Sequence, residues 1–209
     1  WSDVVPAKQK NIWLQADYVS PRPSVKYRGI FINDEDWGLK PWAACNYEKS
    51  LGDIGPRTYA RVCELILRLK GNMLAPAMHP VTGAFYSHSE SKRVADSLGI
   101  IITTSHCEPL LLNNAAKTEW DSKRDGEWNY ATNKQAIYQK WDNRLTEASP
   151  YENIYTLAMR GVHDAGMVGN MPMADRIKTL TQVIADQRSL LQQHLGKKPT
   201  DIPQIFVPY

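Results

Sequence analysis

The sequence predicts an α/β protein with parallel strands, and more narrowly the first half, about five strands, of a (β/α)8 TIM-type barrel. Five short apolar runs alternate with four segments of helical periodicity, which is the order expected of repeated βα units. The runs are apolar enough to be buried on both faces, as in a parallel sheet. Four of them end in polar, ionisable residues, and parallel α/β folds place their sites at the C-terminal ends of their strands.

Length and charge limit the classes of function. The chain has 209 residues, 43% of them hydrophobic, which is enough to bury a core. Its formal net charge of +3 is spread without a Lys/Arg block, so we expect no nucleic-acid partner. No apolar run approaches the roughly 20 residues of a membrane span. Cys45, Cys63 and Cys107 lack CxxC spacing, so neither a disulfide framework nor a structural zinc site is predicted.

The first βα unit starts with a predicted strand at residues 29–32. A turn marked by Gly and Pro follows at residues 52–56, and a helical pattern then runs as far as Gly71. Residues 72–78 form the second predicted strand, which ends at His79. The apolar positions of the helix between these strands are Tyr59, Val62, Cys63, Ile66 and Leu69.

The second helix is predicted at residues 89–98, where a glycine closes it before the strand at residues 100–104. Residues 109–130 form a long loop that contains Trp120 and Trp128. Loops at this position build substrate sites, and an exposed Trp face suits a sugar ring. Core packing is an equally good explanation for each Trp.

A capping box of Thr132 and Gln135 predicts the start of the third helix, and Pro150 marks its end. Its apolar positions are Ile137, Trp141 and Leu145. The fourth strand follows at residues 154–159.

The last helix is predicted to begin at Pro172 and to end at Gly196, before a fifth strand at residues 205–207. Its apolar face is predicted to contain Met173, Ile177, Leu180, Ile184, Leu191 and Leu195.

The turn after the first strand favours a barrel over a doubly wound sheet. Residues 33–37 carry acids where a doubly wound fold would usually offer a glycine-rich phosphate loop. A complete barrel needs about 250 residues, so residues 27–209 are predicted to be its N-terminal half. Residues 1–26 hold three prolines and no clear period, and we predict an extended lead-in from a preceding domain. The chain also starts without Met, so we expect a piece of a longer protein.

The acids after the first strand are the first candidate catalytic groups. Asp34, Glu35 and Asp36 are consecutive, and side-chain alternation would turn about half of them into a barrel mouth. One inward carboxylate is enough for acid or base catalysis. The alternatives are a solvated turn and an acid cluster at a helix N-terminus.

The end of the third strand offers His106 and Glu108 on either side of Cys107. A Cys beside a His raises the idea of a thiolate nucleophile, but it can equally be a small buried hydrophobe. His106 could donate a hydrogen bond to a substrate hydroxyl or orient a carboxylate.

Arg160 ends the fourth strand, where a guanidinium could grip a substrate carboxylate in a bidentate manner. The alternative is an internal ion pair with Asp34 or Glu108. His163 and Asp164 follow, and with the other histidines they could be imagined as metal ligands. The HxH motif of barrel metallohydrolases is missing after the first strand, so we predict no metal and no cofactor.

Five blocks of the sequence together resemble the α-glucuronidases of glycoside hydrolase family 115. They occur in the family's order and span nearly the whole chain. The blocks are residues 27–35 (YRGIFINDE), 67–72 (LRLKGN), 104–109 (TSHCEP), 151–154 with 159–161 (YENI, MRG) and 185–188 (ADQR).

The resemblance implies an inverting glycosidase that releases glucuronic acid or its 4-O-methyl ether from α-1,2 linkages on xylan or related polysaccharides. It implies a secreted, periplasmic or cell-surface protein, and a homodimer is among the expected assemblies. The family's first-strand acid falls on Asp34 with Glu35 beside it, which are the predicted catalytic residues. A further catalytic Glu is expected beyond Tyr209. The predicted substrate-binding residues are His106, Glu108, Arg160 and Asp164.

The chain departs from the family pattern at two places. Cys107 stands where the family commonly has a second His, and residues 162–166 replace a run like Asp-Gly-Asp-Glu-Pro, of which only Asp164 is kept. Two alternatives therefore stay open. One is a carbohydrate-binding relative without turnover, and the more distant one is a metal-dependent barrel hydrolase.

Overall fold

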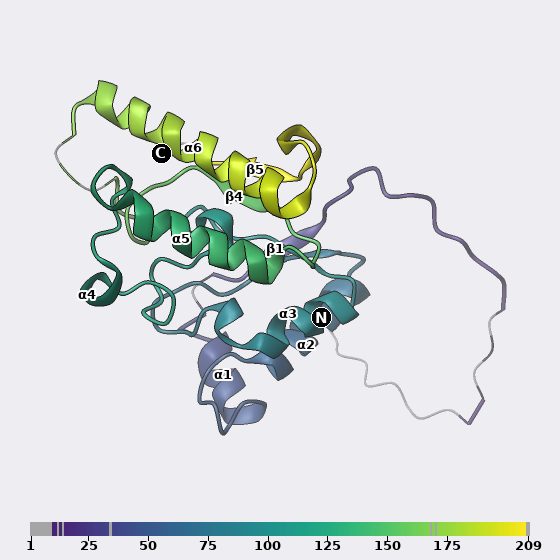
Figure 1. The fold of residues 1–209 in the computed structure, drawn as a ribbon. Coiled ribbons are helices and arrows are strands. Elements are labelled where there is room, and N and C mark those ends of the chain that lie inside the picture. Colours follow the sequence, from purple (N-terminus) through teal and green to yellow (C-terminus); the bar gives the residue numbers. More distant parts are fainter. Residues whose placement is uncertain are drawn as a thin grey trace.

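The protein is an α/β structure with parallel strands, as predicted (Figure 1). The structure is a computed structural model that describes residues 10, 11, 13, 15–33, 35–167, 169 and 171–207. All five predicted strands are present. The first four are shorter than their apolar runs, and the fifth is shifted by one residue toward the N-terminus. The strands are β1 (Gly29–Phe31), β2 (Met73–Ala75), β3 (Ile101–Ile102), β4 (Tyr155–Leu157) and β5 (Gln204–Phe206).

The strands lie side by side in chain order. β1, β2 and β3 form one parallel sheet, and β4 pairs with β5 in another. A parallel bridge between Ile102 and Asn153 joins the two, and the Ile154 amide donates to the Ile102 carbonyl at 2.9 Å. A doubly wound sheet reverses its strand order at a switch point. The described strands show no such reversal, which agrees with a partial barrel.

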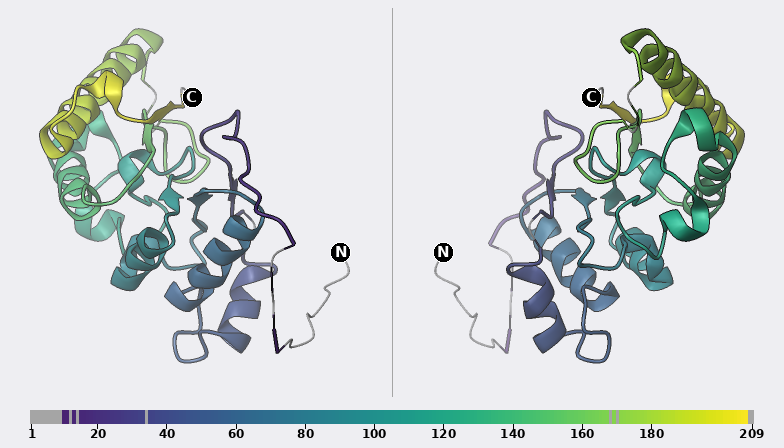
Figure 2. Two further views of the ribbon diagram at one scale, coloured as in Figure 1. Left: turned by 90° about the vertical axis from the view of Figure 1, so that its right-hand side faces the viewer. Right: turned by 90° about the vertical axis from the view of Figure 1, so that its left-hand side faces the viewer.

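The helices pack outside the curve of the strands (Figure 2). β-α crossovers of one hand place successive helices on the same side of a sheet that curls continuously. Seen along the strands, the helices follow an arc from the purple-blue N-terminal part to the yellow-green C-terminal part. They are α1 (Leu39–Asn46), α2 (Pro56–Arg68), α3 (Ser89–Ser97), α4 (Ser122–Asp125), α5 (Tyr130–Ala148) and α6 (Met173–Leu195).

The loop between β3 and α5 is largely part of the core. Trp120 and Trp128 are both buried, and their rings meet edge to face with centroids 4.8 Å apart. Trp128 also packs edge to face on Trp141 of α5, at 6.2 Å. Core packing therefore explains these two Trp residues, and they are not exposed platforms for a sugar.

Two predictions about helices were wrong in detail. The capping box at Thr132 does not start α5: the helix begins two residues earlier, and the Asn129 side chain caps it by accepting from the Ala131 amide at 3.0 Å. On α6, Met173 and Ile177 are exposed. Apolar spacing could not show that the beginning of this helix reaches past its packing partners. The residues of α6 that are buried are Val183, Gln187, Leu190 and Leu191.

Two helices were not predicted. α1 follows the acidic turn after β1, and the single turn α4 lies in the long loop after β3. α1 buries only Ala43, so its sequence has too weak an apolar face to show as a periodic pattern. The described residues before residue 28 form neither helix nor strand, and their assignment as a lead-in stays a prediction. Within the described part of the chain, no helix is long and apolar enough to cross a membrane.

Gln187 of α6 holds the end of β4 in place. Its buried amide accepts from the Ala158 amide and donates to the Ala158 carbonyl, both at 2.9 Å. Ala158 has a φ of 101°, which an L residue adopts only when its surroundings impose it. Gln187 thus provides the N–H and C=O of Ala158, directly after β4, with the hydrogen bonds that a neighbouring strand would otherwise supply.

We expect Gln187→Ala to destabilise the protein by about 3 kcal/mol, because it leaves a buried N–H and a buried C=O without partners. Chemical denaturation of the purified protein measures this. Gln182→Ala is the matched control on the same helix: this amide is exposed, donates to Asp186 at 3.0 Å, and should change stability little. Equal effects of the two changes would contradict the role of Gln187.

Candidate functional site

The site lies where β1 to β4 end, and side chains from these ends contact one another. The turn after β1 meets the end of β2 through Glu35 and His79. The loops after β3 and β4 meet through His106 and Asp164. The His79 ring lies 5.4 Å from the ring of His163, which connects the two halves of the site.

Glu35 is buried, and its carboxylate has one fixed oxygen. Oε1 accepts from the His79 amide at 2.6 Å and from Thr82 Oγ1 at 3.0 Å. The other oxygen, Oε2, is buried and accepts no hydrogen bond within the described part of the chain. The Glu35 carboxylate is thus oriented from one side only.

Of the two acids beside Glu35, the structure describes only Asp36. Asp34 lies outside the described residues, so its prediction as a catalytic acid stays a prediction. Asp36 is partly exposed, and its Oδ1 lies 3.2 Å from His79 Nδ1. Glu35 and Asp36 are therefore not a freely solvated turn, because both carboxylates converge on one imidazole.

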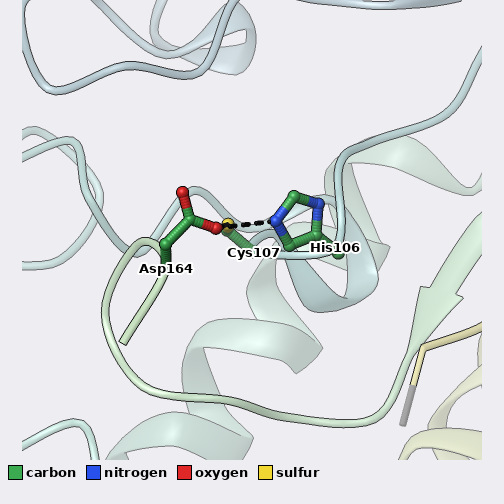
Figure 3. A group of neighbouring side chains, drawn as sticks. All are labelled: His106, Cys107 and Asp164. Carbon is green, nitrogen blue, oxygen red and sulfur yellow. Dashed lines mark hydrogen bonds and ion pairs between the residues drawn. The ribbon is translucent and has the colours of Figure 1, made fainter. Parts of the chain in front are cut away.

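A second group forms around one oxygen of Asp164 (Figure 3). Its Oδ1 lies 2.8 Å from His106 Nε2 and 3.8 Å from the Cys107 sulfur. The hydrogen bond with His106 and the nearby His163 and Arg160 lower the pKa of Asp164. The carboxylate is therefore an ionised acceptor at neutral pH, and it ties the loop after β4 to the end of β3.

Cys107 is poorly suited to be a nucleophile. Burial, and to a lesser extent the charge of Asp164, raise the pKa of its thiol to about 12. The reactive form of a cysteine is the thiolate, which such a pKa disfavours at neutral pH. The geometry supports the alternative of a small buried residue.

Arg160 is almost fully buried, and its guanidinium makes three described hydrogen bonds to residues of its own loop. Nη1 lies 3.2 Å from Asp164 Oδ1, Nη2 donates to the Asp164 carbonyl at 2.5 Å, and Nε donates to the Ala165 carbonyl at 3.3 Å. The ion pair that the sequence allowed with Glu108 is not among these contacts, and the one allowed with Asp34 lies outside the described residues. Arg160 thus supplies positive charge at the strand ends and also shapes the loop.

Glu108 lies beneath this surface as a buried carboxyl. Its Oε2 accepts from the Ser105 amide at 3.1 Å and from Ser105 Oγ at 2.9 Å. Burial outweighs these two hydrogen bonds and raises the pKa of Glu108 to about 8. Glu108 therefore carries a proton at neutral pH, whereas the carboxyl group of an exposed glutamate is ionised.

The loop of residues 161–166 is closed and anchored from outside. The Gly161 amide donates to the Ala165 carbonyl at 3.0 Å, and a Cβ on Gly161 would lie 2.2 Å from the Gly166 carbonyl oxygen. The Asn114 side chain donates to the Gly161 carbonyl and accepts from the His163 amide. Trp128 donates its Nε1–H to the Arg160 carbonyl at 3.0 Å.

The structure shows where the predicted site residues lie, whereas their catalytic and binding roles stay predictions. Glu35, His106, Glu108, Arg160 and Asp164 all lie at the strand ends where we predicted them. The pattern missed the residues that orient them, namely Thr82, Ser105, Asn114 and Trp128. His79 was noted as the end of an apolar run and as one of several imaginable metal ligands. Its contact with Glu35 and Asp36 was not predicted.

Comparisons with known proteins agree with this geometry. The family description "Glycosyl hydrolase family 115" matches residues 20–209. A solved family GH115 4-O-methyl-α-glucuronidase with specificity for decorated arabinogalactans is similar in structure, with a TM-score of 0.81 and 44% sequence identity. The match covers 90% of this chain and 25% of that chain, so this chain spans about a quarter of the enzyme. No curated protein matches significantly. Because the family match covers nearly the whole sequence, the chain belongs to glycosyl hydrolase family 115.

Proposed function

We propose that this chain contributes part of the active site of an α-glucuronidase that releases glucuronic acid or its 4-O-methyl ether from a polysaccharide. The observation that carries the proposal is the group of ionisable side chains at four consecutive strand ends, in a chain that belongs to this family. The described strands are the first five of a (β/α)8 barrel in this proposal, and the remaining strands complete the site.

The residues divide into two roles. Glu35, with Asp34 beside it, supplies one of the two carboxyl groups that glycoside hydrolysis requires. Arg160 supplies positive charge for the carboxylate of the uronic acid, because a guanidinium binds such a group through two hydrogen bonds. His106, Asp164 and Glu108 position the sugar hydroxyls and the loop.

The reaction proceeds with inversion in this proposal. An inverting enzyme keeps its two carboxyl groups roughly 6.5–9.5 Å apart to admit a water molecule. Such a separation suits partners on opposite sides of a barrel mouth, where Glu35 or Asp34 after β1 faces a Glu from beyond β5. Adjacent strand ends would place the two groups closer together.

The proposed substrate is xylan, a polysaccharide to which glucuronic acid is attached by α-1,2 linkages. The similar solved enzyme has specificity for decorated arabinogalactans, so arabinogalactan is the main competing substrate. Polymers of this kind lie outside cells, and we therefore also propose a secreted, periplasmic or cell-surface location. A homodimer stays a proposal as well.

The test is hydrolysis by the full-length protein of glucuronoxylan, decorated arabinogalactan, and matched aryl α-glucuronide and α-glucoside. We expect release of uronic acid from xylan, and no hydrolysis of the neutral glucoside, which lacks the carboxylate for Arg160. Proton NMR of the first product should show the β-anomer.

Each other result removes a defined part of the proposal. The α-anomer as first product would exclude inversion, and release from arabinogalactan alone would exclude xylan. The loop after Arg160 keeps only Asp164 of the family run, so a protein without turnover is the specific rival. Binding of aldouronic acids without any hydrolysis would favour that rival.

A further inference from the structure

Among the residues that the structure describes, side chains that ligate metals in other proteins form two groups at the strand ends. In each group, one ligand atom from each residue lies within 4.8 Å of the others. One group consists of Glu35, Asp36 and His79, and the other consists of His106, Cys107 and Asp164.

The group around Asp164 is poorly suited to a cation. Asp164 Oδ1 already pairs with His106 at 2.8 Å (Figure 3). The same oxygen also pairs with the Arg160 guanidinium at 3.2 Å. The permanent positive charge of Arg160 would repel a metal ion bound to the same oxygen.

The group around His79 has the spacing of a zinc site. His79 Nδ1 lies 3.2 Å from Asp36 Oδ1 and 3.7 Å from Glu35 Oε2. Zinc binds nitrogen and carboxylate oxygen at about 2.0–2.2 Å in a tetrahedron, which places neighbouring ligand atoms roughly 3.3–3.6 Å apart. The two distances lie close to this range on either side. Asp36 and His79 are partly exposed, so an ion and its water can reach them.

The Glu35 carboxylate gives an independent indication of a ligand. Oε2 is buried without a hydrogen bond among the described residues, and it faces His79 Nδ1. Oε1 is held by the His79 amide and by Thr82, so the carboxylate cannot rotate freely to satisfy Oε2. Oriented ligands with one open atom are what a metal site requires.

We propose that a zinc ion binds between Glu35, Asp36 and His79 and inhibits hydrolysis by occupying Glu35. Zinc suits a mixture of one imidazole and two carboxylates, whereas magnesium and calcium prefer oxygen ligands alone. The binding follows from the geometry at His79. The inhibition rests on the proposed function, in which Glu35 takes part in catalysis.

Isothermal titration of the metal-free full-length protein with zinc chloride tests the binding. We expect one site, no comparable binding of magnesium, and affinity lowered at least about 10-fold by His79→Gln and by Asp36→Asn. Asp36 is partly exposed, so Asp36→Asn leaves the fold intact even where His79→Gln does not. His194→Gln is the matched control, because His194 also pairs with a carboxylate, Asp142 at 2.7 Å, but lies on α6.

Zinc titration of His106→Gln shows whether the ion binds at the group around His79 or at the group around Asp164. Unchanged zinc affinity in His79→Gln and Asp36→Asn, or a loss confined to His106→Gln, would overturn the site. Cobalt gives a second signal, because its visible absorption should change with the loss of His79 and not with the loss of His194.

Turnover with and without zinc tests the inhibition separately. Full activity of the zinc-bound protein would overturn the proposed inhibition. The existence of the zinc site would still be decided by the titration. If the proposed function itself fails and no substrate is hydrolysed, the titration is unaffected, so the two failures are distinguishable.

Discussion

Glu35→Gln is expected to lower the kcat of the full-length enzyme by about 10²–10⁴-fold, the usual contribution of a general acid or base. The amide keeps an oxygen that can accept from the His79 amide and from Thr82, so the local structure should persist. It removes only the ability to carry a negative charge or to exchange a proton. Asp34→Asn tests the neighbouring acid in the same assay.

Glu48→Gln is the matched control for this experiment. Glu48 is also buried, and its Oε1 accepts from two amides, those of Arg57 and Thr58, at the start of α2. It should lose stability without a specific loss of kcat. Initial rates on glucuronoxylan, with circular dichroism to check folding, measure both variants. Near-normal rates in Glu35→Gln and in Asp34→Asn would remove the first strand end from the catalytic mechanism.

Glu108→Gln is expected to raise the stability of the protein above pH 7 by several kcal/mol, and to flatten its dependence on pH. The folded state raises the pKa of Glu108 from 4.5 to about 8 through burial. Between these values the folded chain holds a proton that the unfolded chain has released. The contribution of Glu108 to stability is therefore fully present below about pH 4.5 and is lost as the pH rises to about 8.

The expected slope is about −1.4 kcal/mol per pH unit at 25 °C for one proton. A glutamine stays neutral throughout, so the difference between the two proteins should grow with pH. Denaturation at pH 5, 6, 7 and 8 measures it. Glu90→Gln on the surface of α3, where Glu90 pairs with Arg93, is the control and should leave the slope unchanged. A Glu108→Gln protein with the slope of the wild type would mean that Glu108 is already ionised in the folded state.

The sequence predicted those features that depend on local pattern. Apolar runs identified all five strands, and Glu35, His106 and Arg160 lie at the strand ends where they were predicted, while their roles stay predictions. The pattern could not show which loop residues serve others, because Asn114 and Trp128 act on backbone groups about 32 to 49 positions away. It also misplaced the start of α5, since Asn129 and Thr132 are both good capping residues and only the backbone decides between them.

The resemblance to the family added an expectation about the substrate, which the pattern of apolar and ionisable residues does not contain. It implies a uronic acid as the substrate, whereas Arg160 alone indicated only an anionic group. It could not foresee that Arg160 is paired with Asp164. Nor could it foresee the cluster of Asp36 and His79, because a strand-end His has no recognisable motif by itself.

The anchoring of residues 161–166 has a consequence for protein engineering. Asn114 and Trp128 from the loop after β3 hold the loop after β4 at Arg160, Gly161 and His163. A transplant of the β4 loop alone from a relative would break this fit. Swapping substrate preference between family members would therefore require moving both loops together, as a single cassette.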